Sequence, residues 1–183
     1  MKFSSTAITD VLVIEPQVFE DPRGFFMESY RRDAFAAQGI HADFVQFNHS
    51  QSIRHTLRGL HYQVGHPQGK LVRVVRGEVF DVVVDIRFGS PTFGRWITEI
   101  LSARNKKQLY VPVGFAHGFC VLSDEAEFLY FCTDYYYKHG EKGIIWNDPD
   151  LAIPWPAPNP LLSEKDQKNP RFRDIARDFS YKL

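Results

Sequence analysis

Cysteines and long apolar runs are scarce in this sequence, and each absence excludes a class of protein. Only two cysteines, Cys120 and Cys132, occur among the 183 residues. Both lie in apolar, strand-like surroundings without the CxxC spacing of a metal knuckle, which favours reduced, buried thiols. No run approaches the roughly 18 apolar residues of a membrane span, and residues 1–6 lack the apolar core of a signal peptide. We therefore expect a soluble, cytoplasmic protein.

An excess of charge of either sign is also absent. The chain carries 22 basic and 22 acidic side chains, so its formal net charge is +0 at pH 7 and its pI is about 7.1. Without a long-range field, neither nucleic acid nor an anionic membrane is an expected partner, and an anionic ligand needs local charges. With 44% hydrophobic residues and no internal repeat, the chain can bury one core. We expect a single domain over residues 1–183.

Short strand-like segments dominate the pattern of the chain. From residue 43 onward, apolar and β-branched segments alternate with turns at the spacing typical of sandwiches and barrels. A helix is predicted over residues 31–38, ended by Gly39. Before it, residues 11–30 predict an N-terminal hairpin that turns at 20–24. The other predicted strands cover residues 44–47, 56–63, 70–76, 78–87, 95–102, 109–112, 117–122 and 127–137.

Alternation within two of these strands indicates which side chains share a face. Phe80, Val82 and Val84 form an apolar face, so Asp81 points to the other side, into a polar cavity or into solvent. Arg58 and His61 have opposite parity. Both can therefore face one site only across a bulge, unless Arg58 reaches the rim or a second subunit.

The composition becomes Pro-rich after residue 148. Ile153 and Trp155 lie among prolines that exclude a central strand, so we expect this segment to wrap over the domain and bury both side chains. Ser163 precedes Asp166 by three residues, which is the spacing of a helix-capping pair and predicts a short helix. Residues 172–183 are expected to fray.

A base and a cation lie close together in the middle of the sequence. His61 belongs to an apolar-flanked strand segment, and Lys70 opens the next strand after a short turn. If both face one cavity, the imidazole can remove a proton next to a carbonyl while the ammonium stabilises the enolate oxygen. The alternatives are a core histidine with satisfied hydrogen bonds and a solvated lysine at a sheet edge.

An ordered set of motifs over about residues 8–170 resembles the dTDP-4-dehydrorhamnose 3,5-epimerase family. The motifs are DPRGFFME from Asp21, QFNHS from Gln46, LRGLHYQ from Leu57, QGKLVR from Gln68, GEVFDV from Gly77, SPTFG from Ser90, PVGFAHGF from Pro112 and WND from Trp146. The resemblance implies an all-β, mainly antiparallel double-stranded β-helix of the cupin jelly-roll type with a few short helices. It also implies 3,5-epimerisation of dTDP-4-dehydro-6-deoxy-D-glucose in dTDP-L-rhamnose biosynthesis.

The resemblance assigns roles to particular residues. His61 is the expected base, Tyr130 the proton donor and Lys70 the enolate stabiliser, while Asp166 orients His61, a role that competes with helix capping. No metal or other cofactor is implied, because the C4 ketone acidifies both flanking carbons. Tyr136 is the expected residue stacking on the base, with Tyr135 and Tyr137 as alternatives. The other expected substrate-binding residues are Arg23, Phe26, Glu28, Gln46, Phe47, Asn48, Arg58, Asp81, His117, Glu141 and Lys165. The hairpin around Arg23 is expected to reach a neighbouring subunit of a homodimer.

Several other functions stay open. The enzyme could epimerise a single carbon or act as a ketoisomerase, although Tyr130 favours full epimerisation, since an isomerase-like relative is expected to lack that proton donor. A metal-dependent cupin needs a His-x-His ligand pair, but Gln63 stands two residues after His61 and only His117 occupies the second motif position. A non-catalytic sugar-nucleotide-binding module would bind its ligand without exchanging protons.

Overall fold

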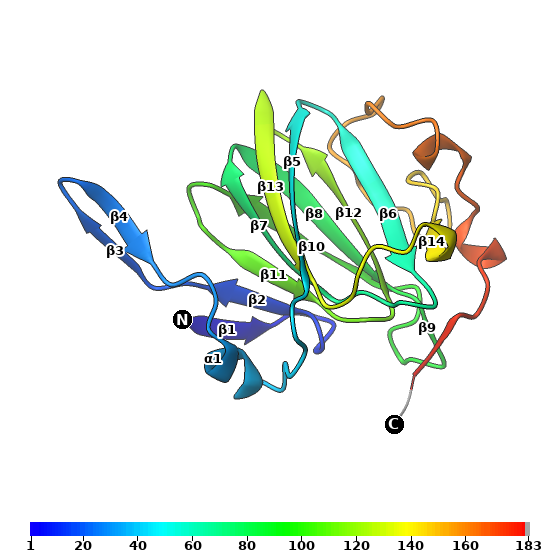
Figure 1. Cartoon of the computed structure of the whole chain (residues 1–183). Coiled ribbons are helices and arrows are strands. Elements are labelled where there is room, and N and C mark those ends of the chain that lie inside the picture. The colour runs from blue at the N-terminus through cyan, green and yellow to red at the C-terminus, as the bar shows by residue number, and fades with distance from the viewer. Residues whose placement is uncertain (182–183) are drawn as a thin grey trace.

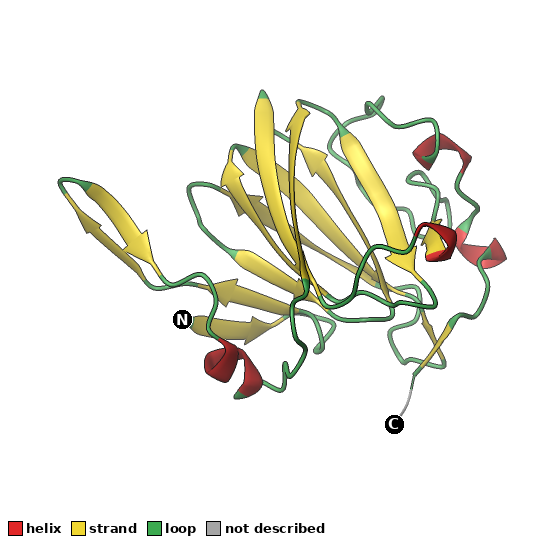
Figure 2. Ribbon diagram, viewed as in Figure 1, coloured by secondary structure: helices red, strands yellow, loops and turns green. Residues whose placement is uncertain are grey.

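The computed structural model describes residues 1–181, and two antiparallel β-sheets that face each other form its body (Figures 1 and 2). This architecture confirms the predicted jelly roll. The six-stranded sheet has the order β1 (Lys2–Ser5), β2 (Leu12–Glu15), β11 (Gln108–Val111), β7 (Lys70–Arg76), β13 (Glu125–Cys132) and β5 (Gln46–Ile53). The five-stranded sheet has the order β10 (Trp96–Ser102), β8 (Glu78–Asp85), β12 (Phe115–Val121), β6 (Leu57–Gln63) and β14 (Glu141–Gly143).

Helical structure is short and peripheral, as the red segments of Figure 2 show. The helix α1 (Arg32–Ala36) lies within the predicted range, and Gly39 follows it with a φ of +81°. The 3-10 turns are η1 (Lys138–Gly140), η2 (Asp166–Lys168) and η3 (Phe172–Asp174). None of the helices within residues 1–181 is both long enough and apolar enough to cross a membrane.

Apolar side chains from both sheets fill the space between them. Val72 from β7 and Phe128 from β13 pack in one cluster with Val79 and Val83 from β8. Burial of side chains of this kind contributes about 1.5–3 kcal/mol each. Asp81 lies on the same inward face of β8 and is 0% exposed, so the solvent alternative for this residue is wrong.

A second apolar layer covers the outer face of the five-stranded sheet. The predicted apolar face of β8, which includes Val82 and Val84, packs against Ile153 and Trp155. Figure 1 shows this C-terminal segment, coloured orange to red, running along one side of the body. The segment packs over the outer face of the sheet with Ile153 and Trp155 partly buried, while Lys182 and Leu183 lie outside the described residues.

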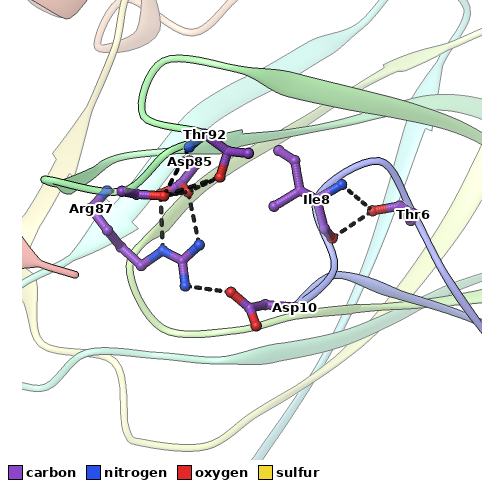
Figure 3. Close-up of polar contacts among 7 residues, drawn as sticks. Thr6, Ile8, Asp10, Asp85, Arg87 and Thr92 are labelled. Carbon is purple, nitrogen blue, oxygen red and sulfur yellow. Dashed lines mark hydrogen bonds and ion pairs between the residues drawn. The ribbon is translucent and has the colours of Figure 1, made fainter. Parts of the chain in front are cut away.

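Fraying was expected for the C-terminal residues, but residues 172–181 are held in place. The short strand β15 (Phe179–Ser180) pairs in parallel with β9 (Arg87–Phe88). Asp85, at the end of β8, accepts hydrogen bonds from Arg87 at 2.9 and 2.8 Å and from Thr92 at 2.6 Å, and Arg87 also donates to Asp10 at 2.6 Å (Figure 3). This network ties β8, β9 and the N-terminal loop together beside the last strand.

A β-bulge interrupts β6. His117 of β12 lies opposite His61, but Phe119 lies opposite Arg58, so β6 has one residue more than β12 in this interval. The two strands approach each other closely at Gly59 and Gly118. A Cβ added at Gly59 would lie only 2.5 Å from the Gly118 Cα, so a side chain does not fit there. The extra residue changes the parity, and Arg58 and His61 consequently face the same side.

The N-terminal hairpin is shorter than predicted. Only β3 (Val18–Asp21) and β4 (Gly24–Met27) form it, and Figure 1 shows it projecting away from the body. The predicted first strand of the hairpin is instead β2, which pairs with β1 and β11 in the six-stranded sheet. The strand β1 was not predicted at all.

Candidate active site

A cavity of about 240 Å³ opens between the two sheets. Side chains able to carry charge or move protons come to it from strands of both sheets. From this group the cavity is lined by Arg58, His61, Lys70, His117, Tyr130 and Glu141. The expected base, cation and proton donor are therefore brought together. His61 lines a cavity and is not a core histidine, and Lys70 lies on an inner strand and not at a sheet edge.

His61 and Asp166 form a dyad at the edge of this cavity. The His61 Nε2 atom lies 2.5 Å from Asp166 Oδ1, and the histidine side chain keeps 29% of its surface exposed, whereas that of Asp166 keeps 4%. Burial opposes ionisation of Asp166, but the hydrogen bond and charge of His61 hold the pKa of the carboxyl below its usual range. With Nε2 engaged, Nδ1 is the ring nitrogen left to act on a ligand.

The two expected roles of Asp166 use different atoms. Its backbone N–H donates to the Ser163 hydroxyl at 3.1 Å, which is the predicted capping contact. Its carboxylate contacts His61. Capping and orientation of the histidine therefore do not exclude each other.

A second histidine–carboxylate pair lies beside the first. His117 pairs with His61 across β12 and β6, and its Nε2 lies 2.9 and 3.0 Å from the two oxygens of Asp81. Asp81 lies behind His117 and does not line the cavity. Burial raises the pKa of Asp81, while the nearby charges of His117 and Lys70 oppose the rise.

Lys70 begins β7 and faces the cavity from the six-stranded sheet. It lies directly opposite Cys132 of β13 in the register of the sheet. Burial lowers the pKa of the Lys70 ammonium, and the charges of Asp81 and Glu141 act in the opposite direction. The two thiols are free and buried, as expected.

Tyr130 lies on β13, in the sheet opposite the one that carries His61. Burial raises the pKa of its hydroxyl, so the phenol keeps its proton at neutral pH. The ring packs at the edge of the inter-sheet core, next to Phe128 at 6.1 Å between centroids. A ligand in the cavity would therefore have an imidazole on one side and a phenol on the other.

Charged and aromatic residues surround the mouth of the cavity. Glu141 forms an ion pair with Lys165 and accepts a hydrogen bond at 2.7 Å from the Tyr136 hydroxyl. Arg58, His61 and Glu141 also line an adjoining cleft of about 370 Å³ that includes Lys165. Of the three consecutive tyrosines, Tyr136 is thus the one connected to the cavity wall, while Tyr137 packs against His66 and His139.

The side chains of the QFNHS motif lie on both faces of β5. Gln46 and Asn48 lie on the half-buried face of β5, where Asn48 Nδ2 contacts Cys132 Sγ at 3.6 Å. Phe47 alternates to the exposed face and stacks on Phe131 with the ring centroids 4.4 Å apart. Within one chain, Phe47 is therefore not brought to the cavity.

The hairpin residues also lie apart from the cavity. Arg23 and Phe26 belong to the projecting turn and β4, and Glu28 follows β4 (Figure 1). Within residues 1–181 the Arg23 guanidinium forms an ion pair only with Asp21, at 2.6 Å, and Phe26 is 71% exposed. Their role in substrate binding stays a prediction, since it depends on a neighbouring subunit.

Four cavity residues were missed by the sequence-based prediction: Ser50, Gly118, Phe119 and Phe128. The signal for two of them was available, because Ser50 shares the parity of Asn48, and Phe128 shares that of Tyr130. Phe119 is the last residue of the PVGFAHGF motif, two positions after His117. No group of three or more His, Cys, Asp and Glu side chains in residues 1–181 is arranged to hold a metal ion.

This chain is similar to known proteins of one family over most of its length. A family model described as dTDP-4-dehydrorhamnose 3,5-epimerase matches residues 5–174. A Pseudomonas aeruginosa protein of that name is 58% identical over 95% of this chain and 97% of its own length. A dTDP-4-dehydrorhamnose 3-epimerase of Streptomyces niveus is 43% identical over 91% of this chain and 82% of its own length.

A solved structure extends the match to three dimensions. The Legionella pneumophila dTDP-6-deoxy-D-glucose-3,5-epimerase, solved in complex with dTDP-4-keto-L-rhamnose, superposes with a TM-score of 0.97 and is 48% identical. It covers 100% of this chain, and this chain covers 99% of it. On the family model, the identity to curated relatives and the shared fold, the chain belongs to the dTDP-4-dehydrorhamnose 3,5-epimerase family.

Proposed function

We propose that this chain epimerises dTDP-4-dehydro-6-deoxy-D-glucose at C3 and C5 to give dTDP-4-dehydro-L-rhamnose. The observation that carries the proposal is the placement of His61 and Tyr130 on facing sheets of one cavity. Epimerisation requires a proton to leave one face of a carbon and another to arrive on the opposite face. A base and an acid on opposite walls provide for both transfers without turning the substrate over.

His61 is the proposed base. Its Nδ1 takes the proton from C5, and in another round from C3, and the electron pair of the C–H bond moves to the C4 oxygen as the enolate forms. Asp166 holds Nε2, fixes the tautomer and stabilises the imidazolium. Tyr130 then returns a proton to the carbon from the opposite wall, and solvent exchange restores both side chains.

Lys70 is the proposed partner of the C4 oxygen. An ammonium within a water-poor cavity stabilises developing negative charge more strongly than it does in bulk water. Burial works against the charged form of Lys70, so the carboxylates of Asp81 and Glu141 help to maintain it. Because the C4 ketone acidifies the carbons on both sides, one set of residues serves C3 and C5.

The nucleotide is proposed to extend from the cavity to its mouth. The cavity of about 240 Å³ lies below the 300–1,000 Å³ of ligand pockets, which supports occupancy by the sugar end of the substrate and not by the whole nucleotide. Arg58 and Lys165 are placed to neutralise the diphosphate, and Tyr136 is exposed beside Glu141 and offers a ring for thymine. Arginine suits phosphate because its planar fork bonds two oxygens at once.

Proton NMR of the substrate in D2O tests the reaction. The purified protein should remove both the C3 and the C5 proton signals, and a downstream reductase should trap a rhamnose-type product. His61→Ala should abolish both exchanges while dTDP binding stays near the wild-type value. Full exchange by the variant would remove His61 from the role of base.

Epimerisation at one carbon is the second candidate. It is favoured by the Streptomyces niveus relative, whose name gives a 3-epimerase. The same spectra separate the two, because a single-carbon enzyme would remove only one of the two proton signals. Loss of neither signal, with dTDP-sugar still bound, would point to a binding module.

We also propose that the chain works as a homodimer with shared sites. The β3–β4 hairpin exposes Phe19, Phe25 and Phe26 on a projecting arm, and an isolated two-stranded hairpin is only marginally stable in water. Cover by a second copy would bury these rings and bring Arg23 to the partner's cavity.

Complementation between two inactive variants tests shared sites. Arg23→Ala and His61→Ala homodimers should each be nearly inactive. After subunit exchange, the mixed dimer has one complete site, so activity should return to about a quarter of the wild-type value if the subunits reassort randomly. No recovery in a mixture shown by light scattering to contain dimers would contradict the sharing.

A further inference from the structure

Among the described residues, one buried polar side-chain atom at the cavity has no hydrogen-bond partner. Ser50 Oγ is buried and has no hydrogen-bond partner among the described residues. Ser50 lines the cavity beside Arg58, His61 and Tyr130. A buried hydroxyl without a partner is unfavourable, so its presence calls for an explanation.

The neighbours of Ser50 on the same face of β5 do have partners. Gln46 Nε2 donates to Asn48 Oδ1 at 3.0 Å, and Asn48 donates to Cys132 Sγ at 3.6 Å. Ser52 Oγ accepts a hydrogen bond from Arg58 Nε at 3.0 Å. Within residues 1–181 the other buried side-chain atoms without partners are Arg73 Nε and Asn169 Nδ2, and these residues do not line the cavity. Ser50 is thus singled out by its position as well as by its free hydroxyl.

The register of the six-stranded sheet places Ser50 away from the ketone end of the cavity. Ser50 lies opposite Phe128 of β13, and Lys70 lies opposite Cys132 of the same strand. Four residues of a strand span roughly 13 Å. Arg58 lies at the Ser50 end, because its guanidinium contacts Ser52 Oγ and the Gln51 carbonyl oxygen.

We propose that Ser50 is a further substrate-binding residue, whose hydroxyl donates a hydrogen bond to an oxygen of the bound sugar nucleotide at the Arg58 end of the cavity. This inference rests on the proposed function. The acceptor is either the phosphate oxygen next to the sugar or a sugar hydroxyl remote from C4. The cationic neighbour Arg58 favours the phosphate.

Ser50→Ala, titrated calorimetrically with dTDP-glucose and with dTDP as stable probes, tests the proposal. Loss of one hydrogen bond should weaken dTDP-glucose binding by about 5- to 20-fold. An equal loss for dTDP assigns the phosphate as acceptor, and a loss confined to dTDP-glucose assigns a sugar hydroxyl. The melting temperature of the ligand-free variant should not fall, because the hydroxyl has no partner to lose.

Ser90→Ala is the matched control. Ser90 is also buried, but its hydroxyl donates to Asp85 at 2.7 Å, away from the cavity. It should show the reverse pattern, with a lower melting temperature and unchanged affinity for dTDP-glucose. If Ser50→Ala fails to fold, Ser50→Cys keeps the unbranched shape of the side chain with a weaker donor and should show the same direction of loss.

The outcomes separate the two proposals. Wild-type affinity of the Ser50 variants for dTDP-glucose would overturn the role of Ser50 and leave the proposed function standing. A lower melting temperature with unchanged affinity would also overturn it, by showing a structural role. Absence of dTDP-glucose binding by the wild-type protein would overturn both.

Discussion

His61 and Asp166, 105 residues apart in sequence, meet through a contact of 2.5 Å between Nε2 and Oδ1. The contact joins β6 of the five-stranded sheet to the 3-10 turn η2 in the C-terminal segment. The segment that closes the outer apolar layer therefore also supplies the carboxylate for the proposed base.

Replacement of Asp166 by Asn should lower kcat by about 10²- to 10⁴-fold, the range of general acid–base and dyad effects. The amide cannot stabilise an imidazolium and can hold the wrong tautomer. The affinity for dTDP should change little, since Asp166 faces His61. Steady-state kinetics together with calorimetry measure both quantities, and wild-type kcat in the variant would contradict the dyad.

A methyl group at Gly59 should disturb the bulge of β6. Gly59 has a φ of +135°, and an added Cβ would lie 2.5 Å from the Gly118 Cα. We expect Gly59→Ala to lower the free energy of unfolding by about 2 kcal/mol or more and to impair both Arg58 and His61. Urea unfolding checks the stability. Gly89→Ala is the control, since it has a similarly positive φ of +84° but open space around its Cβ.

Asp85 should contribute far more to stability than an exposed carboxylate. It is 0% exposed and accepts hydrogen bonds from Arg87, Ser90 and Thr92. Asp85→Ala leaves the largely buried Arg87 guanidinium with a weaker set of partners, and we expect a loss of about 3–5 kcal/mol in urea unfolding. Asp150→Ala breaks the exposed pair with Arg173 and should have little effect. Equal losses in both variants would contradict the importance of burial.

Stability should also fall at alkaline pH because of Tyr62. Burial, with a smaller effect of the Asp178 charge, raises the pKa of Tyr62 to about 12, against 10.0 for an unperturbed tyrosine. The unfolded chain therefore loses this proton first. The contribution is complete below pH 10 and decreases as the pH rises toward 12. Relative to Tyr62→Phe, the wild-type protein should lose about 1 kcal/mol of unfolding free energy between pH 8 and pH 11, and parallel pH profiles would contradict the shift.

Local alternation predicted much of the fold but not the contacts that cross it. The strand β7 has the predicted bounds, because a valine-rich segment lies between a turn and Gly77. Alternation along β5 places Phe47 on the opposite face from Gln46 and Asn48, whereas the motif they share had led us to expect all three in the substrate-binding site. Alternation could not place Arg58 with His61, because the bulge depends on the approach of Gly118 from another strand. The pairing of His61 with Asp166 spans most of the chain, so only the family resemblance indicated it.

The bulge in β6 makes the backbone conformation of residues 58–61 as important to the cavity as their side chains. It places Arg58 and His61 on the cavity side because one surplus residue lies between them relative to β12. Loss of the bulge at constant chain length would restore simple alternation, in which residues three positions apart face opposite sides, and would turn one of the two side chains out of the cavity. Among variants of this enzyme, substitutions that remove the bulge, such as those at Gly59, should therefore be tolerated less well than conservative substitutions of the apolar Leu60.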